Sequence, residues 1–92
     1  MPKVTLEGYI EVPDADLDLV QSELPLHIDL TRKEPGCLTF SVERDQRDGN
    51  RFNVYEVFTS QEAFEHHQAR VKGSRWAVVT KNVQRHYSIR QQ

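Results

Sequence analysis

Apolar and polar residues alternate along the first part of the chain, from Val4 to Val12. This period of two is typical of a β-strand with one buried face. The buried face is predicted to carry Val4, Leu6, Ile10 and Val12. Pro13 follows and ends the strand, because proline cannot donate to a strand ladder.

A helical spacing replaces the alternation after Pro13. Apolar residues recur every three or four positions at Leu17, Val20, Leu24 and Ile28, which indicates an amphipathic helix. Three aspartates stand near its start, where unpaired backbone N–H groups favour negative charge; they are Asp14, Asp16 and Asp18.

Two prolines mark the course and the end of this helix. Pro25 lies inside the pattern, where a proline costs about 3 kcal/mol in a regular helix, so we expect a kink or a break there. Pro35-Gly36 cannot continue a helix. The helix is therefore predicted to end between Thr31 and Glu34.

The middle of the chain reads as a hairpin of two antiparallel strands. Residues 36–45 alternate, with Leu38, Phe40 and Val42 on one face. A polar turn follows at residues 45–50, and the β-prone segment Arg51 to Thr59 comes after it.

The last third predicts a helix, a shorter helical piece and a final strand. Ser60 has the character of an N-cap for a helix that runs through Phe64, His67 and Val71. Gly73-Ser74 interrupts that helix. A second piece is expected at about Arg75 to Asn82, followed by a strand at about Val83 to Ile89.

The predicted order of elements is β-α-β-β-α-β, the α+β arrangement of ferredoxin-like folds with an antiparallel sheet. We expect one domain over residues 1–92. The strand at residues 51–59 has Phe52, Val54 and Phe58 on one parity and Tyr55 and Val57 on the other. A sheet covered on both faces is implied, and since one helical layer covers only one face, a second copy is expected on the other.

Composition narrows the class of protein. Cys37 is the single cysteine among 92 residues, so an intrachain disulfide, a cysteine-based zinc cage and a CxxC redox pair are excluded. Charged residues make up 28% with a net charge of -2, which disfavours a nucleic-acid partner. The longest apolar runs are short, and the N-terminal residues lack the apolar stretch of a signal peptide. We expect a soluble cytoplasmic protein with no membrane association.

Three segments resemble the antibiotic biosynthesis monooxygenase (ABM) superfamily: Glu34 to Phe40, Arg51 to Phe58, and Ala63 to His67. The resemblance extends from the first strand to the last. It implies a homodimeric α/β barrel built from two ferredoxin-like protomers. It also implies small-molecule chemistry, since one branch oxygenates phenolic substrates with molecular oxygen and uses neither flavin nor metal. No cofactor and no metal are therefore expected.

His67 is the first candidate for catalysis, because the resemblance places the family's recurrent histidine there and an imidazole suits a phenol as base or donor. The alternative is a buried histidine that bonds a strand carbonyl. His66 is about 100° away on the helix and is expected to face solvent. Glu56 is the second catalytic candidate. It shares the parity of Phe52 and Val54, so its carboxylate needs a raised pKa or a partner, and an arginine or a backbone amide is the favoured partner.

Four residues are candidates for substrate binding: Trp76, Phe40, Phe64 and His27. Trp76 could instead fill the core, which we favour, and His27 could face the same cavity as His67. Cys37 is expected to be a small buried hydrophobe rather than a nucleophile.

Three functions stay open at this stage. The first is a cofactor-independent monooxygenase of small phenolic, quinol or polyketide-like molecules, with His67 and Glu56 catalytic. The second is a non-catalytic homodimeric module that binds a small apolar ligand, and the third is a structural dimer. Haem degradation is the alternative within the family. It is disfavoured because the haem-degrading branch has an asparagine on the first strand, and this chain has none between Val4 and Val12.

Overall fold

The structure is a computed structural model that describes residues 2–91. Four strands, three helices and one 3₁₀ turn follow one another within these residues. In chain order they are β1 (Val4–Glu11), η1 (Asp14–Asp16), α1 (Leu17–Arg32), β2 (Cys37–Arg44), β3 (Arg51–Phe58), α2 (Gln61–Lys72), α3 (Arg75–Val79) and β4 (Gln84–Gln91). The predicted β-α-β-β-α-β order is confirmed, with the second helical element divided into α2 and α3.

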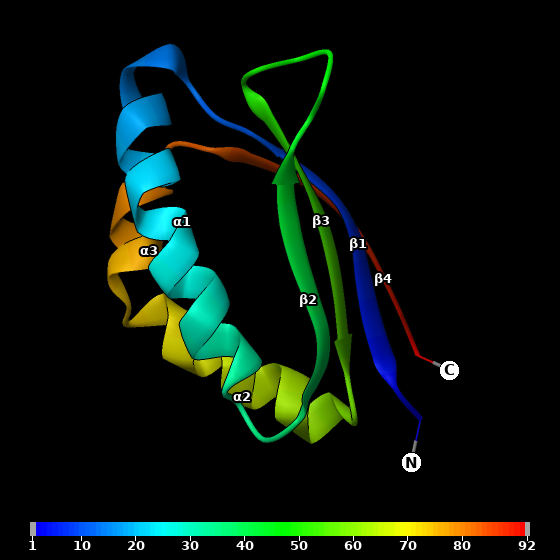
Figure 1. The fold of residues 1–92 in the computed structure, drawn as a ribbon. Helices are drawn as coiled ribbons and strands as arrows, with labels where there is room; N and C mark the ends of the chain where they lie inside the picture. The colour runs from blue at the N-terminus through cyan, green and yellow to red at the C-terminus, as the bar shows by residue number, and fades with distance from the viewer. Residues whose placement is uncertain (1, 92) are drawn as a thin grey trace.

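The four strands form one antiparallel sheet in the order β2-β3-β1-β4. All three helices lie against one face of it (Figure 1). Leu6 on β1 is opposite Glu56 on β3, which in turn is opposite Phe40 on β2. Glu56 therefore projects from the middle of the sheet toward the helices. This is the α+β ferredoxin-like fold that the sequence predicts.

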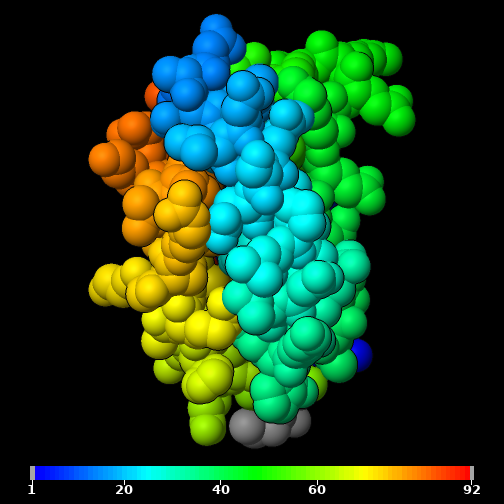
Figure 2. Space-filling view, turned by 60° about the vertical axis from the view of Figure 1, so that its left-hand side comes forward, coloured from blue at the N-terminus to red at the C-terminus, as the bar shows by residue number. Residues whose placement is uncertain are grey.

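The alternation predicted for the strands holds in β1 and β3. Val4, Leu6 and Ile10 are buried under the helices, as are Phe52 and Phe58. The space-filling view shows α1 packed alongside α2 and α3 over this core (Figure 2). The buried hydrophobic residues are Val4, Leu6, Ile10, Val12, Val20, Phe40, Val42, Phe52, Val54, Phe58, Phe64, Trp76, Val79 and Val83.

The alternation predicted for β2 is wrong at Leu38. The β2–β3 register shifts between Cys37 and Thr39, and this irregularity changes the face on which the intervening side chain lies. Leu38 is 50% exposed, whereas Phe40 is buried as predicted. Cys37, expected to be buried, is only partly buried against the core.

The break expected at Pro25 is also wrong, because α1 continues through it from Leu17 to Arg32. Proline removes the hydrogen bond to the carbonyl four residues earlier, which belongs to Gln21. Both Pro25 and Gln21 line an open groove beside Phe52. The carbonyl that loses its partner therefore lies close to solvent, where water can hydrate it.

Serine side chains start both helices of the second half. Ser60 Oγ accepts a hydrogen bond from the Ala63 N–H, so the predicted N-cap of α2 is confirmed. Ser74 Oγ accepts from the Ala77 N–H at the start of α3. The helical piece predicted to reach Asn82 ends at Val79, where the chain turns toward β4.

Two glycines allow neighbouring backbone segments to pack closely. Gly8 has φ +157°, and a Cβ there would lie 1.9 Å from the carbonyl oxygen of His86 on β4. At Gly36 a Cβ would lie 2.3 Å from the Ala63 Cβ. The segment after α1 therefore packs tightly against the first turn of α2.

The sheet face away from the helices carries both polar and apolar side chains. Tyr55 is 39% exposed there, and Asn53 and Val57 are half-buried. A hollow of about 650 Å³ runs along this face, with Tyr9, Arg51 and Tyr55 in its lining. No helix within residues 2–91 has the length and apolar character to cross a membrane.

Candidate functional site

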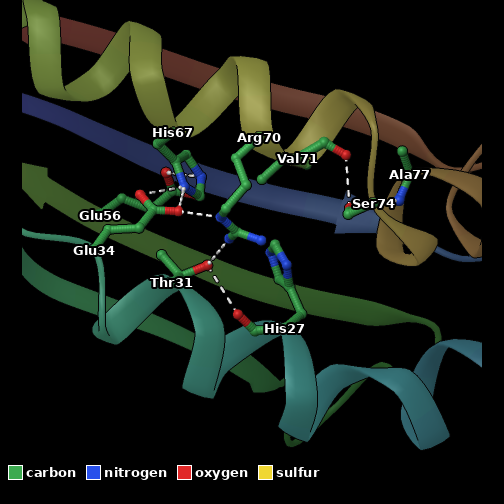
Figure 3. A network of polar contacts seen from close by, with 9 residues as sticks. All are labelled: His27, Thr31, Glu34, Glu56, His67, Arg70, Val71, Ser74 and Ala77. Atoms are coloured by element: carbon green, nitrogen blue, oxygen red, sulfur yellow. Dashed lines mark hydrogen bonds and ion pairs between the residues drawn. The ribbon is translucent and has the colours of Figure 1, made fainter.

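Three acidic and basic side chains from separate elements meet between the helices and the sheet (Figure 3). His67 comes from α2, Glu56 from β3, and Glu34 from the segment that joins α1 to β2. His67 is 3% exposed and Glu56 is 6% exposed, so the group is almost fully removed from water. Burial of this kind strengthens electrostatic interactions among the three side chains.

Glu34 holds one nitrogen of the His67 ring. His67 Nδ1 lies 3.1 Å from both carboxylate oxygens of Glu34. Glu34 already accepts a hydrogen bond from Arg70 Nε, so its oxygens act as acceptors and Nδ1 is the donor. The other nitrogen, Nε2, is then the acceptor of the ring. It faces Glu56 Oε1 at 3.7 Å, which is too long for a hydrogen bond.

Arg70 links α2 to α1 next to this pair. One guanidinium nitrogen donates to Thr31 Oγ1 at 2.9 Å, and the Thr31 hydroxyl donates to the His27 carbonyl at 2.8 Å. His67 and Arg70 are three residues apart on α2 and therefore share one helix face. Glu34 accepts from both, and so it lies where α1, α2 and the segment before β2 meet.

Aromatic rings also lie close to the His67 ring. The His27 ring stacks on Trp76 with 4.4 Å between centroids and lies edge-on to Phe40. The His67 ring is 5.7 Å from Phe40 and 6.3 Å from His27. Two of the four predicted substrate-binding residues, Phe40 and His27, therefore lie beside His67, and Trp76 reaches it through its stack on His27.

Phe64, the fourth predicted binding residue, reaches the group only through another ring. It packs edge-on against Phe58 with 5.7 Å between centroids. Phe58 in turn lies 4.9 Å from the His67 ring. Phe64 thus supports the wall that faces His67.

Burial shifts the pKa values of the titratable groups toward their uncharged forms. It raises the pKa of Glu56 to about 8, with help from the nearby Glu34 carboxylate. Burial lowers the pKa of His67, and the hydrogen bond that its Nδ1 donates to Glu34 opposes that shift in part. Burial, together with the charges of His67 and Arg70, lowers the pKa of His27 to about 3. At neutral pH the group therefore combines a protonated Glu56, two neutral imidazoles and a Glu34–Arg70 ion pair.

Two buried polar atoms have no hydrogen-bond partner within residues 2–91: Glu56 Oε1 and His27 Nδ1. The arginine expected to pair with Glu56 does not do so, because Arg70 is engaged by Glu34 and Thr31. Burial instead raises the pKa of the Glu56 carboxyl. An unpartnered buried acid is costly, and such groups cluster at functional sites.

A surface hollow reaches the group from the side of Glu34. It measures about 460 Å³, and its lining includes Glu34, Gly36, Ala63 and His66. His66 is exposed, as predicted. The Glu34 side chain is 7% exposed, so it stands between this hollow and the His67 ring.

Several residues of the site were not identified from the sequence. Glu34 and Arg70 contact His67 or its partner directly, and Thr31 anchors Arg70. The spacing of His67 and Arg70 on one helix face was the available signal. Within residues 2–91, histidine, cysteine and acidic side chains form no group of three suited to a metal ion.

The fold and the site together define an α+β protein with a histidine held by a carboxylate beneath an antiparallel sheet. The family model of the antibiotic biosynthesis monooxygenases (ABM) matches residues 3–77. The chain therefore belongs to the antibiotic biosynthesis monooxygenase family, as the sequence motifs indicated.

Solved structures show the same fold at low sequence identity. The chain is similar to a "Putative antibiotic biosynthesis monooxygenase" from Nitrosomonas europaea, with 16% identity and a TM-score of 0.78 over 99% of this chain and 88% of that one. A protein of the same description from Deinococcus radiodurans gives 22% identity and a TM-score of 0.77, over 97% of this chain and 89% of that one. A search of curated proteins finds no match.

Proposed function

We propose that this protein is a cofactor-independent monooxygenase that oxidises small phenolic, quinol or polyketide-like molecules with molecular oxygen. The observation that carries the proposal is the pairing of two complementary groups in a dry site. His67 Nε2 is an acceptor without a hydrogen bond, and 3.7 Å away stands Glu56, an acid whose pKa is raised to about 8. Such a pair can take a proton from a substrate and supply another.

The chemistry needs no external reductant. For a substrate with an activated methylene group, CH₂ and O₂ give C=O and H₂O, so the substrate provides all four electrons. A base first removes a proton, and the resulting anion is electron-rich enough to reduce oxygen and form a carbon–oxygen bond. The peroxide that results takes up a proton, and loss of water then yields the carbonyl. One oxygen atom enters the product and the other leaves as water.

In this proposal His67 removes the first proton through Nε2. Glu56, protonated at neutral pH, donates a hydrogen bond to the substrate anion and then its proton to the peroxide. Phe40, Trp76 and His27 form the walls against a planar substrate, and Phe64 supports them through Phe58. Exclusion of water by these rings protects the anion from reprotonation.

Substrate entry requires the packed rings to separate. His67 and Glu56 are 3% and 6% exposed, and the His27–Trp76 stack closes the space beside them. These two rings come from α1 and α3. A small outward movement of α3 would open the group, and such short helical segments are well suited to gating.

We further propose that the protein is a homodimer that pairs through the sheet face away from the helices. Tyr55 is exposed there, next to the half-buried Val57, and a second sheet would cover both. Light scattering coupled to size exclusion tests this. Tyr55→Glu is expected to yield monomers, whereas a monomeric wild type contradicts the pairing.

The test of the function is oxygen uptake by purified, metal-stripped protein with a panel of hydroquinones and anthrone-like phenols. His67→Ala removes the proposed base, and His66→Ala is the matched control on the exposed side of the same helix. We expect uptake above the spontaneous rate from wild type and from His66→Ala, and a loss of about 10²-fold or more in His67→Ala. A folded protein that takes up no oxygen but binds these molecules would instead favour the binding module.

A further inference from the structure

Two carboxyl groups flank the His67 ring, and their contacts differ. Glu34 approaches Nδ1 at 3.1 Å through both oxygens. Glu56 approaches Nε2 only to 3.7 Å and its Oε1 has no hydrogen-bond partner within residues 2–91. The charged and titratable groups around the ring are therefore Glu34 before β2, Arg70 on α2, His27 on α1 and Glu56 on β3.

We propose that Glu34 is the positioning residue of the site, and that it holds His67 with the proton on Nδ1 and the lone pair of Nε2 directed toward Glu56. A neutral imidazole carries its proton on either nitrogen, and a carboxylate at one nitrogen selects the form that donates to it. The catalytic consequence rests on the proposed function, whereas the selection of the tautomer does not.

The surroundings of Glu34 keep it in this position. Arg70 Nε donates to Oε2 of Glu34, which keeps the carboxylate an acceptor toward His67. Two residues before Glu34, the Arg32 guanidinium donates to the Phe40 carbonyl at 2.9 and 3.1 Å. Two residues after it, Gly36 packs against Ala63 so closely that a Cβ would not fit. The segment is thus fixed on both sides of Glu34, as a positioning residue requires.

Glu56 cannot take this role. Burial raises its pKa to about 8, so at neutral pH it is an acid and a donor. Its nearest approach to the ring is 3.7 Å, at Nε2, which is too long for either oxygen to hold the imidazole by a hydrogen bond. The two carboxyl groups therefore have different roles: Glu34 is the charged acceptor at Nδ1, and Glu56 is the neutral acid near Nε2.

The experiment is a nitrogen–proton correlation NMR spectrum of the histidine rings, recorded on the folded protein without substrate. His67→Gln assigns the signal. We expect the wild-type His67 ring to be protonated at Nδ1 and not at Nε2 near neutral pH. A wild-type His67 ring protonated at Nε2 would overturn the inference.

Glu34→Gln then tests the cause, with Glu62→Gln as the control. Glu62 lines the same hollow as Glu34 but is exposed on α2. In Glu34→Gln we expect a mixture of tautomers, and a pKa of His67 that falls because the carboxylate that raises it is gone. Glu62→Gln should keep the wild-type spectrum. An unchanged tautomer in Glu34→Gln would refute the inference.

Oxygen uptake separates this inference from the proposed function. If both are correct, Glu34→Gln loses about 10²-fold or more of the rate, and the pH profile shifts with the pKa of His67. If wild type takes up no oxygen while its ring is held at Nδ1, the proposed function fails and the positioning by Glu34 stands.

Discussion

Replacement of Glu56 by glutamine should make the stability of the protein less sensitive to pH between 4.5 and about 8. Glu56 is 6% exposed, and its pKa rises from 4.5 to about 8 on folding. The folded state then binds more protons than the unfolded state between these two values. Stability from this group is complete below 4.5 and is lost as pH rises to about 8. Glutamine has nearly the same shape and does not titrate.

The size of the effect follows from the shift. A shift of one pKa unit corresponds to about 1.4 kcal/mol, so the full shift of Glu56 from 4.5 to about 8 changes the unfolding free energy by about 5 kcal/mol. Between about pH 5 and about pH 7.5, Glu56→Gln should gain about 3 kcal/mol in unfolding free energy relative to wild type. This is a large part of the unfolding free energy of an ordinary domain, which is roughly 5–15 kcal/mol.

Urea denaturation at a series of pH values measures this difference. The pKa values of His27 and His67 are also lowered on folding, but both residues are present in both proteins and their contribution to the difference largely cancels. Glu62→Gln, an exposed glutamate on α2, should follow wild type at every pH. A constant difference between Glu56→Gln and wild type across the range would show that Glu56 is not a buried acid, and the proton donor of the proposed mechanism would be lost.

Three more predictions concern the same region. The pKa of His27 is lowered from 6.5 to about 3, so stability from this group is present above 6.5 and is lost as pH falls. Between about pH 6.5 and about pH 4, His27→Phe should gain about 3 kcal/mol in unfolding free energy relative to wild type. His66→Gln should follow wild type, and parallel pH curves for His27→Phe and wild type would contradict the prediction. Gly36→Ala should destabilise by about 1–3 kcal/mol through its clash with Ala63, and the double variant with Ala63→Gly should recover part of that in thermal unfolding. Ser60→Ala should cost about 1 kcal/mol by loss of the α2 cap; no change in melting temperature would refute this role.

Much of the fold was predictable because burial repeats with the period of each element. The alternation of Val4, Leu6 and Ile10 and the cap at Ser60 each specify local structure from a few neighbouring residues. Two local predictions failed where distant structure decides. Leu38 turns outward at an irregularity of the β2–β3 register, and Pro25 stays inside α1, beside an open groove that it lines together with Gln21.

The candidate site was predictable only in the parts that lie on regular elements. The burial of His67 and Glu56 follows from helix and strand periodicity, whereas His67 became a catalytic candidate through the resemblance to the family. Glu34 lies in the connection before β2, where no periodicity indicates the direction of a side chain. Its contact with His67 depends on the packing of Gly36 against Ala63, which joins segments far apart in the sequence.

The first strand of the chain, β1, completes its pairing only with the last strand, β4. β1 lies between β3 and β4, and Val4 pairs with Gln91. A nascent chain that has emerged only as far as β3 can pair β2, β3 and β1, but the other edge of β1 stays unpaired until β4 has been synthesised. A chain arrested before Gln84 leaves that edge of β1 open, and open edges pair with other chains. Interrupted translation should thus yield aggregates rather than a smaller folded protein.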